Sequence, residues 1–129
     1  MENSAGYKWE QKKILVVEDD ESSAYLLGEI LRETGARIDY TTDGEEAVEF
    51  VKEHPETDLI LMDIHLPVMD GFAATREIKT FAEHVVVIAQ TAYGYSLDYQ
   101  QAEQAGCDAF LTKPLNSAVL LDKMNSYLS

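Results

Sequence analysis

Acidic residues that could bind a metal ion follow two apolar segments of this 129-residue chain. Glu18, Asp19 and Asp63 stand directly after those segments, and Thr91 and Lys113 stand at the ends of two later ones. Carboxylate oxygens are the ligands that Mg²⁺ prefers, while an ammonium group and a hydroxyl can bind phosphate oxygens. A carboxylate nucleophile beside such groups suits phosphoryl transfer.

Each of these side chains also has an ordinary structural explanation. An acidic residue after a strand is often solvated or caps a helix, and we expect Asp20 to be a cap. Lys113 alone would be a surface lysine, and Thr91 alone a strand residue. Their combination is informative because like charges about 4 Å apart repel by about 4 kcal/mol at an effective dielectric near 20. Clustered carboxylates therefore predict a nearby cation, and Mg²⁺ with Lys113 would serve.

Short apolar segments alternate with amphipathic ones along most of the chain. The expected strands are residues 14–17, 37–41, 59–62, 85–88 and 108–112. Helices are expected after Asp20, after Asp43, after Gly71, over 96–105 and after Asn116. This alternation predicts an α/β fold, a doubly wound (βα)5 parallel sheet with helices on both faces. The carboxyl ends of parallel strands share one edge, so the acidic residues, Thr91 and Lys113 should meet there.

Composition limits the classes of protein to consider. The length suits one domain, which we place at residues 13–129 after a polar lead-in or linker over 1–12. Lys+Arg 10 against Asp+Glu 24 gives a net charge of −14, which argues against direct binding of nucleic acid or an anionic membrane. The single cysteine favours a reducing, cytoplasmic location. Neither a signal peptide nor a membrane-spanning run is evident.

Four segments carry a resemblance to a known family. In order and spacing, ILVVEDDE, DLILMDIHLPVMDG, VVVIAQTA and FLTKP resemble the receiver domain of two-component response regulators. The resemblance covers about residues 13 to 128, and it implies a flavodoxin-like sheet with strand order 2-1-3-4-5.

The resemblance implies a role for each acidic residue. Asp63 would accept a phosphoryl group from the phosphohistidine of a histidine kinase or histidine phosphotransfer domain. The chain would thereby catalyse its own phosphorylation and later dephosphorylation, without being a conventional enzyme. Asp19 would bind Mg²⁺ directly and Glu18 through water, with Asp63 and the backbone carbonyl of His65 as the remaining protein ligands.

Other residues match the family's phosphate-binding and switch positions. Thr91 and Lys113 would bind phosphate oxygens, and the Lys113–Pro114 bond would be cis. Phe110 matches the switch aromatic coupled to Thr91, although it lacks the hydroxyl of the frequent Tyr. Glu18 stands where many members have Asp.

Bulky side chains flank the expected acceptor. His65 and Tyr93 occupy the two variable positions that tune phosphoryl lifetime in this family, and they could hinder the attacking water. We therefore expect a long-lived phosphorylated form. Tyr93, Tyr95 and Tyr99 either pack over the sheet or form a partner surface beside the switch.

Other functions would require different residues at these positions. A flavin carrier of the same topology would need a phosphate-binding loop where residues 18–20 are acidic. An aspartyl phosphatase would need an acid where His65 stands. A degenerate receiver would only bind proteins, although all core residues are present. The flanking motifs favour a receiver from a hybrid sensor kinase over a stand-alone regulator. His54, His65, His84 and Cys107 lack the spacing of a zinc site.

Overall fold

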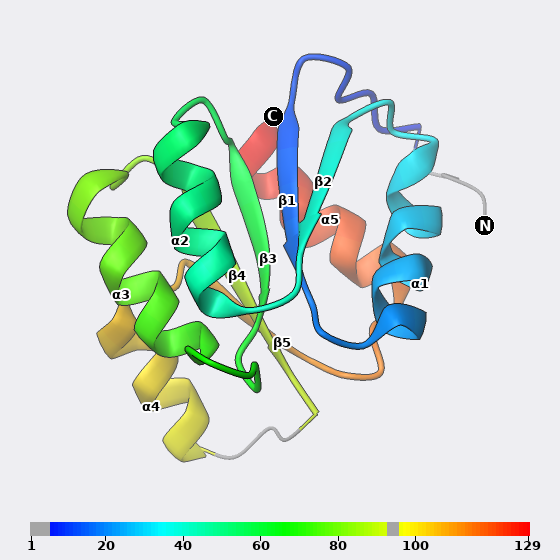
Figure 1. Cartoon of the computed structure of the whole chain (residues 1–129). Helices are drawn as coiled ribbons and strands as arrows, with labels where there is room; N and C mark the ends of the chain where they lie inside the picture. The colour runs from blue at the N-terminus through cyan, green and yellow to red at the C-terminus, as the bar shows by residue number, and fades with distance from the viewer. Residues whose placement is uncertain (1–5, 93–95) are drawn as a thin grey trace.

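A five-stranded parallel sheet forms the centre of the protein, seen here in a computed structural model that describes residues 6–92 and 96–129 (Figure 1). The strands are β1 (Lys13–Val17), β2 (Arg37–Thr41), β3 (Leu59–Asp63), β4 (Val86–Thr91) and β5 (Ala109–Thr112). Their order is β2-β1-β3-β4-β5, and all four pairings are parallel. The predicted doubly wound fold and strand order are confirmed.

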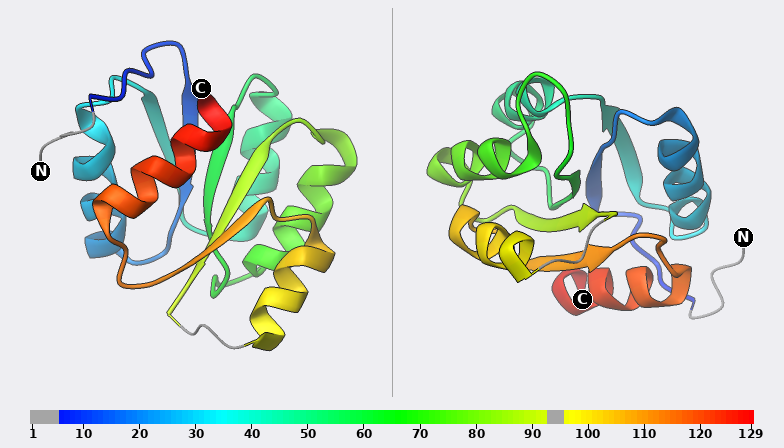
Figure 2. Two further views of the ribbon diagram at one scale, coloured as in Figure 1. Left: turned by 180° about the vertical axis from the view of Figure 1, so that it is seen from behind. Right: turned by 90° about the horizontal axis from the view of Figure 1, so that it is seen from below.

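Within the described residues, five helices alternate with the strands and cover both faces of the sheet (Figure 2). They are α1 (Glu21–Arg32), α2 (Gly44–Glu53), α3 (Gly71–Phe81), α4 (Ser96–Ala105) and α5 (Ser117–Leu128). The side chains of Asp20, Asp43 and Asn116 accept hydrogen bonds from first-turn backbone N–H groups, as the sequence predicted. Asp70 caps α3 in the same way.

The two faces bury separate apolar layers, because successive side chains of a strand point to opposite sides. Ile14 and Val16 pack with α1 and α5, whereas Leu15 and Val17 pack with α2 and α3. A smaller layer around Ala89 packs with α4. Strands covered on both faces explain why β1, β3 and β4 are continuous apolar runs without alternation.

The carboxyl ends of the strands lie at the lower edge of the sheet in Figure 1, where β1 leads into α1. This edge is tightly built around Asp63. Gly71 donates its backbone N–H to the carbonyl of Ile64 over 3.1 Å, and a Cβ on Gly71 would collide with the carbonyl oxygen of Asp63. Glycine is therefore needed where α3 starts against the end of β3.

The N-terminal segment differs from the sequence prediction. Trp9 was expected to lie outside the fold, yet it is only 4% exposed and belongs to the core beneath α1 and α5. Its backbone N–H donates to the carbonyl of Thr34 over 2.7 Å, its indole N–H donates to Asn125 over 3.3 Å, and its ring stacks on Tyr7. Trp9 lies in the core because burial of its large aromatic ring is favourable. The polar residues beside it in the sequence masked this signal.

Truncation of this ring should be costly. We expect Trp9→Ala to lower the free energy of unfolding by about 3–5 kcal/mol, because a large buried side chain leaves a cavity. Lys8→Ala, a change at the exposed neighbouring residue, is the matched control and should stay within about 0.5 kcal/mol. Urea denaturation of both variants measures the difference, and equal stability would show that the segment contributes nothing to the domain.

Candidate functional site

Three carboxylates meet at the carboxyl edge of the sheet. One oxygen from each of Glu18, Asp19 and Asp63 lies within 4.8 Å of the other two, the one such acidic or metal-ligating group found among the described residues. Glu18 and Asp63 are 3% and 5% exposed, and Asp19 is exposed. Two buried ligands and one open to solvent match the oxygen donor set of a Mg²⁺ site that keeps several waters.

Lys113 supplies the positive charge of this cluster. Its Nζ donates to Oε1 of Glu18 over 2.8 Å and lies 3.6 Å from Oδ2 of Asp63. Burial, aided by the Asp63 carboxylate, raises the pKa of Glu18 against the opposing effect of Lys113. Burial alone would lower the pKa of Lys113, but Glu18 and Asp63 raise it overall. The ammonium group is therefore firmly charged, and the acidic pair is only partly neutralised.

Backbone groups hold the two buried carboxylates in place. The N–H of His65 donates to Oδ1 of Asp63 over 3.0 Å, and the N–H of Asp20 donates to Oε2 of Glu18 over 3.3 Å. Asp20 turns its own side chain to the N–H of Ser23, so it is a helix cap as expected. These hydrogen bonds fix the orientation of both carboxylates beside Lys113.

The predicted phosphate-binding and switch residues lie beside this cluster in the sheet. Thr91 is fully buried at the end of β4, and its carbonyl accepts a 2.7 Å hydrogen bond from the backbone N–H of Lys113. Phe110 is partly buried, with its ring centroid 4.2 Å from that of Tyr99. The Lys113–Pro114 peptide is cis, as predicted. Tyr93 and Tyr95 lie outside the described residues.

One contact at this site could not be predicted from the sequence. His65 is exposed in the loop after β3, but its Nε2 lies 3.1 Å from Oγ1 of Thr91. The two residues are 26 positions apart, and a loop sequence does not encode the direction of its side chains. The imidazole thus connects the loop after Asp63 to the end of β4.

Gln90 is a second residue that the sequence interpretation passed over. It is fully buried on β4 opposite Asp63 in the strand register, and neither side-chain amide atom has a hydrogen-bond partner among the described residues. Gln90 borders a cavity of about 410 Å³ between α1 and the Lys113–Leu115 segment. Its presence in the apolar run before Thr91 was the available signal.

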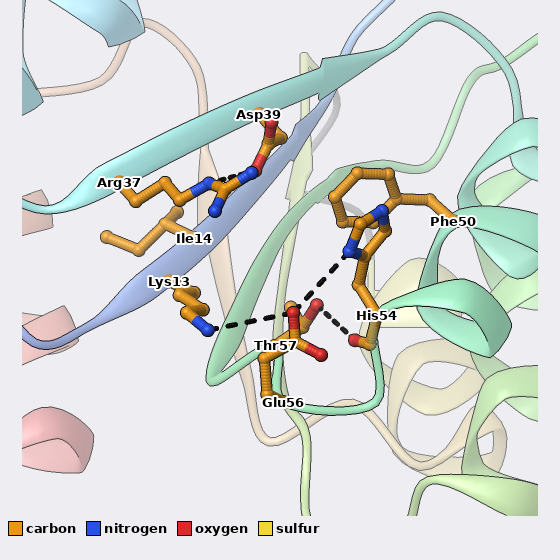
Figure 3. Close-up of a pocket in the computed structure, with 8 residues that line it drawn as sticks. All are labelled: Lys13, Ile14, Arg37, Asp39, Phe50, His54, Glu56 and Thr57. Atoms are coloured by element: carbon orange, nitrogen blue, oxygen red, sulfur yellow. Dashed lines mark hydrogen bonds and ion pairs between the residues drawn. The ribbon is translucent and has the colours of Figure 1, made fainter.

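The opposite end of the sheet carries charges that only pair with one another (Figure 3). Oε2 of Glu56 lies 3.7 Å from Nζ of Lys13 and 3.4 Å from Nδ1 of His54. Arg37 forms an ion pair with Asp39. The cavity among them measures about 10 Å³, roughly the space of one water molecule. This cavity therefore has no room for a ligand larger than a water molecule.

The remaining histidine and the cysteine also have structural roles. His84 lies 2.9 Å from the carbonyl oxygen of Pro55, and no zinc-like group of histidines and cysteines occurs in the described part of the chain. Cys107 is a half-buried free thiol whose pKa is raised to about 11, chiefly by burial. Such a thiol is almost entirely protonated near neutral pH and unreactive.

Comparison with known proteins matches this geometry to one family. The family model described as the response regulator receiver domain matches residues 14–125, which is most of the chain. The chain belongs to the response regulator receiver family. It is therefore a receiver domain of two-component phosphorelay signalling, a family in which an aspartate is phosphorylated in a Mg²⁺-dependent reaction.

Several relatives span nearly the same length. The chemotaxis protein CheY of Halobacterium salinarum is 38% identical over 92% of this chain and 98% of its own. The receiver domain of sensor histidine kinase PA1611 from Pseudomonas aeruginosa, solved with a magnesium ion in the active site cleft, is 35% identical with a TM-score of 0.84. It covers 91% of this chain and 97% of its own.

A third structure contains a partner. The receiver domain of Ssk1 from Saccharomyces cerevisiae, crystallised with the histidine phosphotransfer protein Ypd1, is 31% identical with a TM-score of 0.85. It covers 91% of this chain and 88% of its own. No helix among the described residues of the present receiver is long and apolar enough to cross a membrane.

The unpaired amide of Gln90 leads to a stability prediction. We expect Gln90→Leu to raise the free energy of unfolding by about 1–3 kcal/mol, because a similar volume is kept while two buried polar atoms without partners are removed. Gln104→Leu, at an exposed position of α4, is the matched control and should change little. Urea denaturation reports both, and a destabilised Gln90→Leu variant would show that the amide is satisfied in solution.

Proposed function

We propose that Asp63 is the phosphoacceptor of this receiver and takes its phosphoryl group from a phosphohistidine. The observation that carries the proposal is the convergence of Asp63, Glu18 and Asp19 with the ammonium group of Lys113 at one edge of the sheet. Asp63 ends the central strand β3, its Oδ2 lies 3.6 Å from Nζ of Lys113, and it holds the acceptor position that the family resemblance implies.

The chemical step follows from these contacts. A carboxylate oxygen of Asp63 attacks the phosphorus, the new O–P bond forms, and the P–N bond to the donor imidazole breaks. The electron pair returns to the imidazole nitrogen, which takes up a proton. Lys113, 3.6 Å from the acceptor carboxylate, stabilises negative charge on the phosphoryl oxygens, and the Thr91 hydroxyl donates a hydrogen bond to one of them.

The carboxylates would hold Mg²⁺ in this reaction. We assign Asp19 and Asp63 as direct ligands, Glu18 as a ligand through water, and the carbonyl oxygen of His65 as the remaining protein ligand. The fit rests on the oxygen-only donor set and on the incomplete neutralisation of three carboxylates by one lysine. When bound, the ion supplies positive charge to the transferring phosphoryl oxygens.

The partners follow from the same chemistry. We propose a histidine kinase or a histidine phosphotransfer domain as the phosphodonor, and neither nucleic acid nor a membrane as a direct partner, given the net charge of −14. The face around Tyr99, which is 48% exposed and in contact with Phe110, is the proposed output surface, with Tyr93 and Tyr95 beside it in sequence.

Three finer expectations stay predictions. The bulky exposed His65 beside Asp63 supports a long-lived phosphorylated form, because it restricts the approach of water. A cytoplasmic location rests on the single free cysteine. Relatives include both a sensor-kinase receiver and a CheY protein, so origin in a hybrid kinase remains a prediction from the flanking motifs.

The acceptor assignment can be tested by intact-protein mass. After incubation with acetyl phosphate and MgCl₂, the wild-type chain should gain one phosphoryl group, and Asp63→Asn should gain none because its side chain is not a nucleophile. Chelation of Mg²⁺ with EDTA should also abolish the gain.

Asp122→Asn is the matched control. The Asp122 carboxylate lies on α5 and accepts a hydrogen bond from the hydroxyl of Tyr7, and it is not part of the acidic cluster. It should be phosphorylated like the wild type. A folded wild-type chain that is modified neither by acetyl phosphate nor by phosphorylated histidine domains would instead support a degenerate receiver that only binds proteins. Modification of Asp63→Asn would place the acceptor elsewhere.

A further inference from the structure

His65 lies between the proposed acceptor and the buried hydroxyl of Thr91. Its backbone N–H donates to Oδ1 of Asp63 over 3.0 Å, while its side-chain Nε2 is joined to Oγ1 of Thr91 by a 3.1 Å hydrogen bond. The bond thus links the loop after β3 to the last residue of β4. Thr91 is completely buried, so the imidazole reaches a group that solvent does not.

We propose that His65 is a latch that holds Thr91 in its resting position and must release it when Asp63 is phosphorylated. This inference rests on the proposed function and assigns a regulator to that site. The latch resides in the imidazole side chain and is separate from the metal-ligand role assigned to the His65 backbone carbonyl. His65 is accordingly a positioning residue, since its side chain acts through Thr91.

The hydroxyl of Thr91 can serve one arrangement at a time. A hydroxyl has a single proton to donate. If Nε2 accepts that proton, a phosphoryl oxygen must displace the imidazole to receive it. If Nε2 carries the proton instead, Oγ1 accepts it and the hydroxyl keeps its own proton, so the bond then acts only by fixing the position of the threonine oxygen. In both tautomers the bond between His65 and Thr91 stabilises the resting arrangement.

A contact made only in the resting state shifts the equilibrium toward that state. The phosphoryl group offers anionic oxygens, whose hydrogen bonds are roughly twice as strong as neutral ones, so it can replace the imidazole as the partner of Thr91. Loss of the hydrogen bond between His65 and Thr91 makes the free energy of binding a phosphoryl group less favourable. Removal of a neutral hydrogen bond of ordinary strength should therefore tighten phosphoryl-mimic binding about threefold to tenfold.

Beryllofluoride binding to the full chain in MgCl₂ tests the latch. We expect His65→Leu, which keeps bulk but forms no hydrogen bond, to bind about threefold to tenfold more tightly by calorimetric titration. In NMR spectra without beryllofluoride, its Thr91 amide signal should move toward the beryllofluoride-bound position. His65→Gln, which can still bond to Thr91, should restore affinity to within about twofold of the wild type. His84→Leu is the matched control and should change neither readout.

A double-variant comparison separates the latch from simple access to the site. In a Thr91→Val background, the change His65→Leu should have no effect on affinity, because the hydroxyl that the imidazole holds is gone. Equal or weaker binding by His65→Leu, or the same gain in the Thr91→Val background, would overturn the latch while leaving the acceptor assignment intact. Absence of beryllofluoride binding by the wild type would instead refute the proposed function.

Discussion

Repulsion among the carboxylates of Glu18, Asp19 and Asp63 is the physical constraint on which the functional edge of this receiver depends. Three negative charges with ligand oxygens within 4.8 Å of one another destabilise the fold unless positive charge joins them. Lys113 contacts two of the three carboxylates. Its single positive charge leaves the cluster with a net negative charge, which favours binding of a cation. We propose that the same unbalanced charge that costs stability attracts Mg²⁺ and a phosphoryl group accompanied by it.

The parallel sheet makes this arrangement possible because it delivers residues distant in sequence to one edge. Glu18 and Lys113 are 95 positions apart, yet β1 and β5 end at the same side of the sheet and their side chains form a 2.8 Å hydrogen bond. Apolar packing on both faces supplies the stability that the charged edge lacks. Phe110 lies on β5, the strand next to β4, and its ring contacts Tyr99 of α4. This is the route by which the proposed change at Thr91 would reach the surface.

Much of this could be predicted from the sequence because the relevant signals are local. Continuous apolar runs mark strands buried on both faces, and the acidic residues stand immediately after them. Trp9 was misplaced because one aromatic residue among polar neighbours shows no periodicity. The contact of His65 with Thr91 could not be predicted, since it depends on the direction of a loop side chain. Gln90 could have been noticed, because alternation along β4 places it on the same face as the buried Ile88.

The stability of the metal-free and Mg²⁺-loaded chains tests the central electrostatic claim most directly. Urea unfolding of wild type and Asp63→Asn should be compared in EDTA and in excess MgCl₂. If repulsion governs the site, Asp63→Asn should be more stable than wild type in EDTA by on the order of 1 kcal/mol, and Mg²⁺ should stabilise wild type more than the variant. A wild type that is at least as stable as Asp63→Asn in EDTA, and indifferent to Mg²⁺, would contradict it.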